Sequence, residues 1–142
     1  MPYSTIELES FVQIRAPEIA RDIRKAADKA HNEADLVAEV EKVLERFAKN
    51  FDVNLNLSRE RTLINGRADA VYNRLVIEYE PPHSLHKTNE YQSNKHAIQQ
   101  VKDYMDGLER LDRQRKERLA GVVLDGFFFI FIRYRDNRWF VD

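Results

Sequence analysis

Residues 66–80, with the sequence GRADAVYNRLVIEYE, decide the fold. Their apolar and β-branched residues predict two short strands joined by a turn, which bring Asp69, Glu78 and Glu80 to one place. Side chains alternate along a strand, so Glu78 and Glu80 share one face and Tyr79 lies on the other. An apolar run directly precedes these residues, so we expect the two glutamates to lie near a core.

The three carboxylates indicate a particular chemistry. Strands rarely contain carboxylates, and buried charges are costly unless they are paired or bind a metal. The spacing D-x8-E-x-E therefore suggests a site for a hard divalent cation, which prefers oxygen ligands. So short an acidic pattern also arises by chance.

This pattern resembles the PD-(D/E)XK nuclease superfamily, whose fold is called restriction-endonuclease-like. There, an acid on one strand and an acid-x-lysine on the next bind magnesium beside the scissile phosphate. The matching residues are Asp69, Glu78 and, at the lysine position, Glu80. Glutamate is a minority variant at that position and removes the usual cation. The resemblance implies that Asp69 and Glu78 bind Mg²⁺, for which Mn²⁺ substitutes, with assistance from Glu33.

Glu33 lies at the start of a helix predicted over Asn32–Ala48. The helix has an apolar face at helical spacing, formed by Leu36, Val37, Val40, Leu44 and Phe47. At ~100° per residue, Glu33 falls on the centre of that face. One explanation is local, since Asn32 would cap the helix and an acid in the first turn suits its dipole. The other is that Glu33 points under the sheet towards the acidic cluster, like the first-helix acid of the superfamily.

A second helix is predicted over Ser93–Arg113. Its core stripe consists of Ile98, Val101, Met105 and Leu108. Gln100 and Tyr104, at i and i+4, lie on a neighbouring face. They resemble the Q-x-x-x-Y motif of an exonuclease-related branch of the superfamily, where the Gln positions the site and the Tyr supports the phosphate or the metal-bound water. A solvated Gln and a half-buried Tyr are also common on helices.

Composition limits the function classes. The chain has 142 residues, 43% of them hydrophobic, which predicts one domain over residues 1–142 with its own core. It has no cysteine, which excludes disulfides and thiolate chemistry and favours a cytoplasmic location. We expect no membrane association, because no apolar run is long enough to span a bilayer. The net charge of -1 is not that of a strong stand-alone DNA binder.

The cations are unevenly distributed. A first group lies on the first helical stretch and a second follows the Q-x-x-x-Y helix, where it comprises Arg110, Arg113, Arg115, Lys116 and Arg118. Either group could contact phosphates, although interleaved acids also suit a solvated surface. In the polar loop that follows Glu80, His83, His86 and Lys87 could replace the charge of the missing lysine, or could simply be solvated.

The chain order predicts a mixed α/β sheet flanked by helices. The expected elements are a helix over Ala16–Ala30 with Pro17 in its first turn, the Glu33 helix, strands over Val53–Leu57, Thr62–Tyr72 and Leu75–Glu80, the Q-x-x-x-Y helix, and strands over Gly121–Leu124, Phe127–Ile132 and Trp139–Val141. The turns Asp125-Gly126 and Asp136-Asn137 separate the last three strands. We expect the phenylalanine-rich run at 127–131 to be a core strand. The order agrees with the αβββαβ core of the superfamily plus a terminal strand extension.

The hypothesis for function is a Mg²⁺-dependent deoxyribonuclease, and we expect it to act as an endonuclease. Residues 75–82 and 119–126 also resemble N-terminal nuclease domains fused to adenine-DNA methyltransferases in restriction–modification proteins. That resemblance implies a domain excised from a longer protein, with a methyltransferase and a target-recognition region elsewhere. Because cutting both strands usually needs two sites, we expect a homodimer. The alternatives are a catalytically inactive nuclease fold that docks nucleic acid or protein, and a purely structural domain without metal binding.

Overall fold

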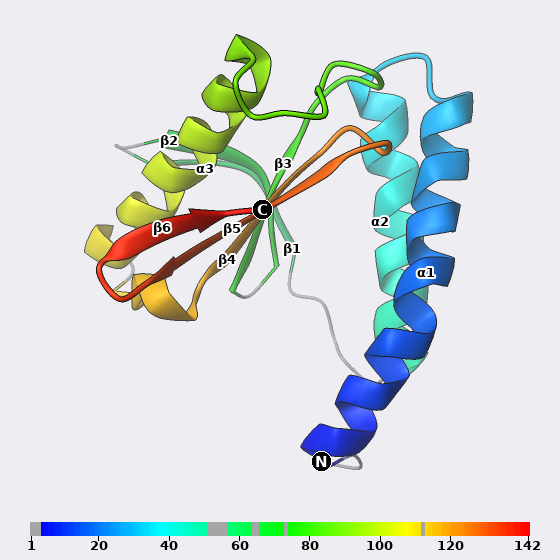
Figure 1. Ribbon diagram of the computed structural model, residues 1–142, viewed down its shortest axis with the longest axis horizontal. Coiled ribbons are helices and arrows are strands. Elements are labelled where there is room, and N and C mark those ends of the chain that lie inside the picture. Colours follow the sequence, from blue (N-terminus) through cyan, green and yellow to red (C-terminus); the bar gives the residue numbers. More distant parts are fainter. Residues whose placement is uncertain (1–3, 51–56, 64–65, 73, 112) are drawn as a thin grey trace.

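The structure has three layers, with a β-sheet between one helix and a pair of helices (Figure 1). It is a computed structural model that describes residues 4–50, 57–63, 66–72, 74–111 and 113–142, and for residues 5, 8, 57–63 and 66–72 it describes the backbone alone. The elements are α1 (Thr5–Lys29), α2 (Glu33–Asn50), β1 (Leu57–Leu63), β2 (Gly66–Tyr72), β3 (Leu75–Tyr79), α3 (Gln92–Leu111), the short 3-10 helix η1 (Lys116–Arg118), β4 (Ala120–Leu124), β5 (Phe129–Arg135) and β6 (Arg138–Val141). The predicted fold class, a mixed sheet flanked by helices, is confirmed.

The sheet contains the six strands in chain order. Neighbouring strands are antiparallel except β3 and β4, which are parallel and are connected through α3. A parallel pair needs a long crossover, and a helix is the usual one. Because α3 brings the chain back so that β4 runs in the same direction as β3, the carboxyl ends of the two strands lie at the same end of the sheet. We name this end, with the turn and loop that follow the two strands, the carboxyl edge.

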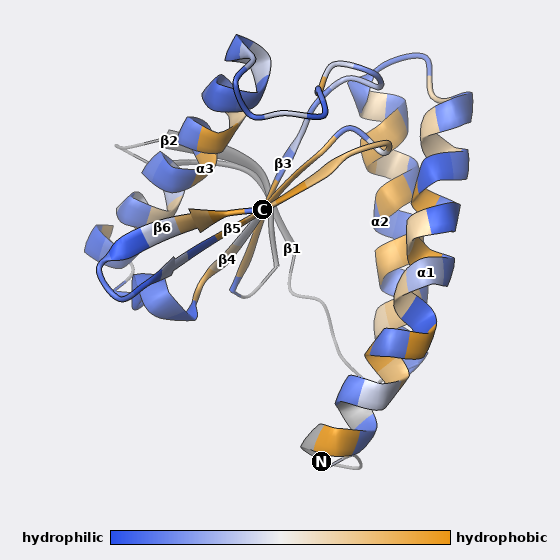
Figure 2. Ribbon diagram, viewed as in Figure 1, coloured by the Kyte–Doolittle hydropathy of each residue, from blue (hydrophilic) through white to orange (hydrophobic). Residues whose placement is uncertain are grey.

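Each face of the sheet has its own core. On one face, α3 packs through a fully buried stripe of the residues predicted for it, Ile98, Val101, Met105 and Leu108. On the other face, α1 and α2 pack through Ile23, Ala27, Leu36, Val40 and Val43. Polar and apolar residues alternate along α1 and α2, whereas β4 and β5 are largely apolar (Figure 2). This distribution is expected when central strands are covered on both faces.

The first helix begins much earlier than the predicted Ala16. Ser4 and Glu7 form a capping box, in which the backbone N–H of Ser4 donates to Glu7 Oε2 at 2.8 Å and that of Glu7 to Ser4 Oγ at 3.3 Å. These two bonds satisfy N–H groups that a helix start otherwise leaves unpaired. Pro17 therefore lies inside α1 and not in its first turn, so the Gln13 carbonyl lacks its helical donor.

Strand boundaries in the first hairpin were also predicted wrongly. The strand expected over Thr62–Tyr72 is divided between β1 and β2, which pair with Leu63 opposite Gly66. The prediction missed the connection between Leu63 and Gly66, whose residues 64–65 lie outside the described part of the chain. Of the strand expected over Val53–Leu57, only Leu57 belongs to β1, and residues 53–56 lie outside the described part of the chain.

The turns in the last three strands agree better with prediction. Asp136 and Asn137 have φ of 51° and 60°, the left-handed conformation that a tight hairpin turn between β5 and β6 requires. Gly126 has φ of 90°, and an added Cβ would lie 2.2 Å from Ala27 Cβ, so only glycine fits between the turn and α1. The phenylalanine-rich run is a core strand only at alternate positions, because Phe131 is 52% exposed.

Lys116 connects α3 to the terminal hairpin. Its ammonium group forms an ion pair with Asp106 at 2.7 Å and lies 4.1 Å from the centre of the Tyr134 ring. Burial alone would lower the pKa of Lys116, but the hydrogen bond to Asp106 and the charges of Asp106 and Glu109 outweigh it and raise that pKa above its ordinary value. The folded state therefore holds this proton more tightly than the unfolded chain.

We expect Lys116→Met to lower the free energy of unfolding by about 1–2 kcal/mol at pH 8, through loss of the ion pair and the cation–π contact. A raised folded pKa stabilises the protein below the unfolded pKa of about 10.4, and this stabilisation disappears as the pH rises through the folded pKa. Urea denaturation should thus show a smaller difference in the free energy of unfolding between wild type and variant at pH 11 than at pH 8. Lys95→Met, at an exposed position of α3, is the control. A difference that is the same at both pH values would contradict the assignment.

Candidate functional site

Strand β3 separates its side chains between the two cores. Val76 packs in the core with α3, whereas Ile77 and Tyr79 pack in the core with α1 and α2. By the alternation of a strand, Glu78 lies on the α3 face with Val76. The predicted opposition of Tyr79 and the glutamate is therefore confirmed, and Glu78 is only 7% exposed.

Asp69 lies in β2, next to β3. The pairing of the two strands runs from Tyr72 opposite Leu75 to Ala70 opposite Ile77. The next residues on the two strands are Asp69 and Glu78, so the backbone register brings these two positions together, as the sequence predicted. The side chain of Asp69 lies outside the described part of the structure.

Glu80 directly follows β3. Its backbone N–H donates to Leu124 O at 2.9 Å, which extends the pairing of β3 and β4 by one residue, and its side chain is half-buried. Two residues of extended chain place the Cα atoms of Glu78 and Glu80 roughly 7 Å apart. Pro81 and Pro82 then end the strand, because proline cannot donate to a sheet.

Glu33 is the first residue of α2 and is half-buried. The local explanation for this acid has direct support, since the Asp35 N–H donates to Asn32 Oδ1 at 2.9 Å and Asn32 thus caps the helix. Helix α2 covers the face opposite to that of Glu78. Its start nevertheless lies at the carboxyl edge, because Leu36, one turn after Glu33, comes against Gly126 in the turn after β4.

Gln100 and Tyr104 lie on α3, over the face that carries Glu78. Gln100 is half-buried, and Tyr104 is fully buried in the core that includes Val76. A half-buried Tyr104 was the alternative to a tyrosine that supports the phosphate or the metal-bound water, and the structure places the ring deeper than that alternative. Contact of its hydroxyl with a phosphate would require that face to open, and positioning of α3 against β3 is the role that the burial favours.

Two buried side chains, Asp125 and Asn94, hold the loop after β3. Asp125, fully buried, accepts a hydrogen bond from the Leu85 N–H at 3.0 Å. Asn94, also fully buried, accepts from the His86 N–H at 3.0 Å and donates to the carbonyls of His86 and Thr88. Sequence reasoning missed both anchors, although Asp125-Gly126 was recognised as a turn.

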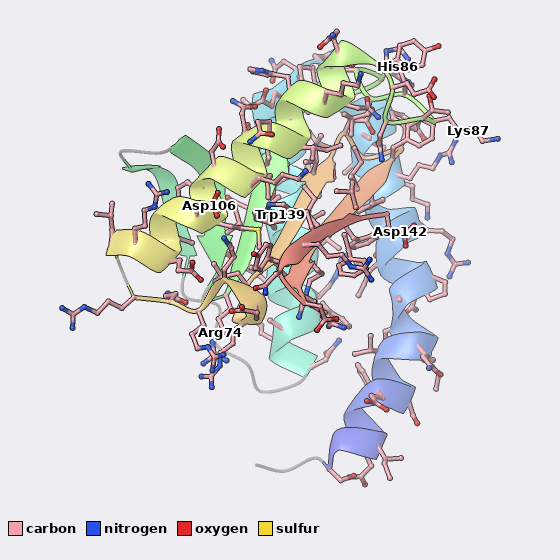
Figure 3. All side chains as sticks on the ribbon, turned by 60° about the vertical axis from the view of Figure 1, so that its left-hand side comes forward. Arg74, His86, Lys87, Asp106, Trp139 and Asp142 are labelled. Carbon is pink, nitrogen blue, oxygen red and sulfur yellow. The ribbon has the colours of Figure 1, made fainter. Side chains whose placement is uncertain are left out.

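The cations proposed to replace the missing lysine lie on the outer side of this loop. The ring of His86 stacks on Tyr91 at 3.9 Å, and that of His83 stacks on Phe127 at 4.0 Å. His83, His86 and Lys87 are all exposed. Figure 3 shows Lys87 extending away from the protein, so in this conformation its charge lies outside the sheet.

The donor set suits a hard cation only if Asp69 contributes. Within the residues that carry described side chains, no group of three His, Asp or Glu residues could hold a metal ion. Glu78 and Glu80 supply two carboxylates on one face, and Asp69, at the paired position, would supply the third. Oxygen donors of this kind match Mg²⁺, which binds through one or two carboxylates and keeps several waters.

Comparisons of the chain with protein-family models, curated proteins and solved structures found no match. In the described part of the chain, no helix is both long enough and apolar enough to cross a membrane. The class of protein therefore has to be argued from the site itself.

Proposed function

We propose that this chain is a metal-dependent nuclease domain that hydrolyses phosphodiester bonds of DNA, of the PD-(D/E)XK kind. The main support is Glu78, a carboxylate buried in a central strand, with Asp69 on the next strand one residue beyond the Ala70–Ile77 pair. The order helix, three strands, helix, strand agrees with the core expected for that superfamily.

In this proposal each site residue has a role. Asp69 and Glu78 would hold Mg²⁺, with Glu33 assisting directly or through water. When bound, the ion supplies a water of lowered pKa and neutralises charge on the phosphate. Glu80 orients that water or accepts its proton. Gln100 steadies the scissile phosphate, and Tyr104 holds α3 in place behind it.

The biological setting is part of the same proposal. A cleavage module of a cytoplasmic restriction–modification or DNA-repair protein would take its sequence recognition from another region, which is consistent with the net charge of -1. Cleavage of both strands would require two copies of the site, hence a homodimer.

A second function, docking of nucleic acid or protein without cleavage, is favoured by one observation. Glu80 takes the place of the usual lysine, and His86 and Lys87 are exposed on the loop that follows it. A docking domain predicts binding without hydrolysis. Metal-dependent cleavage discriminates between the two functions.

The test is cleavage of supercoiled plasmid by the purified chain with Mg²⁺ or Mn²⁺, beside samples with EDTA and the Asp69→Ala variant. We expect nicking or linearisation that requires metal and is lost in the variant. Absence of cleavage together with an unchanged melting temperature on adding metal would refute the proposal. Absence of cleavage with a metal-induced rise in melting temperature that Asp69→Ala abolishes would retain the metal site and leave the reaction to the rest of a longer protein.

A further inference from the structure

An arginine-lined hollow lies at the end of the sheet opposite to the carboxyl edge. It has a volume of about 570 Å³ and is lined by Arg74, Arg113, Gln114, Arg115 and Arg118. We call it the arginine hollow. Figure 3 shows Arg74 at the far end of the molecule from His86, with side-chain nitrogens gathered beside it.

Two separate segments form the arginine hollow. Arg74 directly precedes β3, whereas the other lining residues belong to the connection between α3 and β4. The Ala120 N–H donates to the Arg74 carbonyl at 2.9 Å, which fixes the two segments side by side. Sequence reasoning grouped the cations after α3 but had no signal that Arg74 joins them, because only the parallel pairing of β3 and β4 brings it there.

Lys116 binds two acids near the arginines. In the sequence, acids interleave with the cations and indicate a solvated surface of mixed charge. In the structure, Lys116 Nζ lies 2.7 Å from Asp106 and 3.8 Å from the interleaved Glu109, and the Lys116 N–H donates to Glu109 at 2.9 Å. Lys116 itself lies against Tyr134, away from the hollow.

Within residues 74–111 and 113–142, Arg74, Arg113, Arg115 and Arg118 form no ion pair, and no acid of these residues lines the hollow. A helix end favours cations, which accounts for Arg113 after α3. It does not account for Arg74, which comes from another element. Four like charges around one hollow repel one another unless an anion binds between them.

The lining determines the kind of anion. The guanidinium group presents a planar fork that matches phosphate oxygens in a bidentate manner. Among the residues with described side chains, the hollow is lined by arginine and glutamine, with no aromatic ring on which a base could stack. These residues suit the phosphodiester backbone of a nucleic acid, with contacts that position the polymer and carry no sequence information.

We propose that the arginine hollow is a phosphate-backbone binding site for nucleic acid, separate from the carboxylates. Four residues of strand separate Arg74 from Glu78, roughly 13 Å. Binding there requires neither metal nor cleavage, so the inference stands apart from the proposed nuclease activity and can be tested in EDTA.

The test measures the affinity for a fluorescein-labelled 20-base-pair DNA duplex by fluorescence anisotropy, in EDTA and at several NaCl concentrations. The variant is Arg74→Gln/Arg118→Gln, and the matched control is Lys49→Gln/Lys95→Gln, which removes the same charge from exposed positions outside the hollow. We expect the hollow variant to bind at least about tenfold more weakly and the slope of log K against log salt to fall by about 2, one for each lost phosphate contact. The control should stay within about twofold of wild type.

Further samples separate the sources of the anion and the classes of partner. Arg74→Lys/Arg118→Lys keeps the charge but not the fork, and intermediate affinity would support bidentate phosphate contacts. Sodium phosphate that displaces the duplex no better than NaCl of equal ionic strength would favour the polymer over free phosphate. Equal losses in variant and control, absence of duplex binding by wild type, or binding of labelled polyglutamate in place of DNA would each overturn the proposal.

Discussion

Glu78→Gln is expected to lower metal-dependent DNA cleavage by about a thousandfold, equivalent to ~4 kcal/mol of transition-state stabilisation. Glutamine has nearly the shape of glutamate and can still accept and donate hydrogen bonds, so the buried position in β3 stays filled. What is lost is the negative charge on the α3 face, which the proposed Mg²⁺ site requires. The effect should therefore appear in catalysis and metal binding more than in folding.

The measurement is the rate of plasmid nicking at saturating Mg²⁺, with circular dichroism to verify the fold. Glu90→Gln is the matched control, because it removes the same charge and Glu90 is exposed on the loop that follows the site. We expect this control to cleave within about twofold of wild type. If Glu78→Gln is folded and cleaves at the wild-type rate, Glu78 lies outside the reaction and docking becomes the better hypothesis.

The parts of the fold that sequence predicts are those with strong local patterns. The α3 stripe at helical spacing and the Asp136-Asn137 turn each depend on neighbours in the sequence, and both were predicted correctly. The same holds for Glu78, whose face follows from the period of two in β3. These features need no knowledge of which elements meet in space.

Features that depend on distant contacts were not predictable. The depth of Tyr104 depends on how closely α3 packs on the sheet, and the exposure of Phe131 depends on α1 leaving that part of β5 uncovered. Arg74 reaches the arginine hollow only through the pairing of β3 with β4. For the candidate site, the sequence named Asp69 and Glu78, and the register of β2 and β3 brings their backbone positions together.

Asp125 is the buried group that connects the turn after β4 to the loop after β3. Its carboxylate accepts hydrogen bonds from the backbone N–H groups of Leu85 at 3.0 Å, Phe127 at 2.9 Å and Phe128 at 2.8 Å. The Leu85 side chain is itself buried in the α3 core, so this bond fixes the loop at the carboxyl edge. The bonds from Phe127 and Phe128 hold the turn that contains Gly126.

We expect Asp125→Ala to lower the free energy of unfolding by about 2–4 kcal/mol, because it removes the acceptor of one buried and two part-buried backbone hydrogen bonds. An unsatisfied buried donor costs about 1–3 kcal/mol, and the part-buried donors cost less because water can reach them. Asp125→Asn keeps one acceptor oxygen and should lose less. Urea denaturation checks both variants, with Asp28→Ala at an exposed position of α1 expected within about 0.5 kcal/mol of wild type.

A local readout distinguishes the loop anchor from general destabilisation. In Asp125→Ala, the Leu85 amide should exchange with solvent at least about a hundredfold faster. The exchange rates of amides in the α3 core should change only as much as the loss of global stability requires. Equal acceleration at every amide would mean that Asp125 stabilises the fold without holding the loop. Because Glu80 bonds to Leu124, directly before Asp125, release of the loop should also displace Glu80. Cleavage by Asp125→Ala, measured well below its melting temperature, should then fall even where the protein is fully folded.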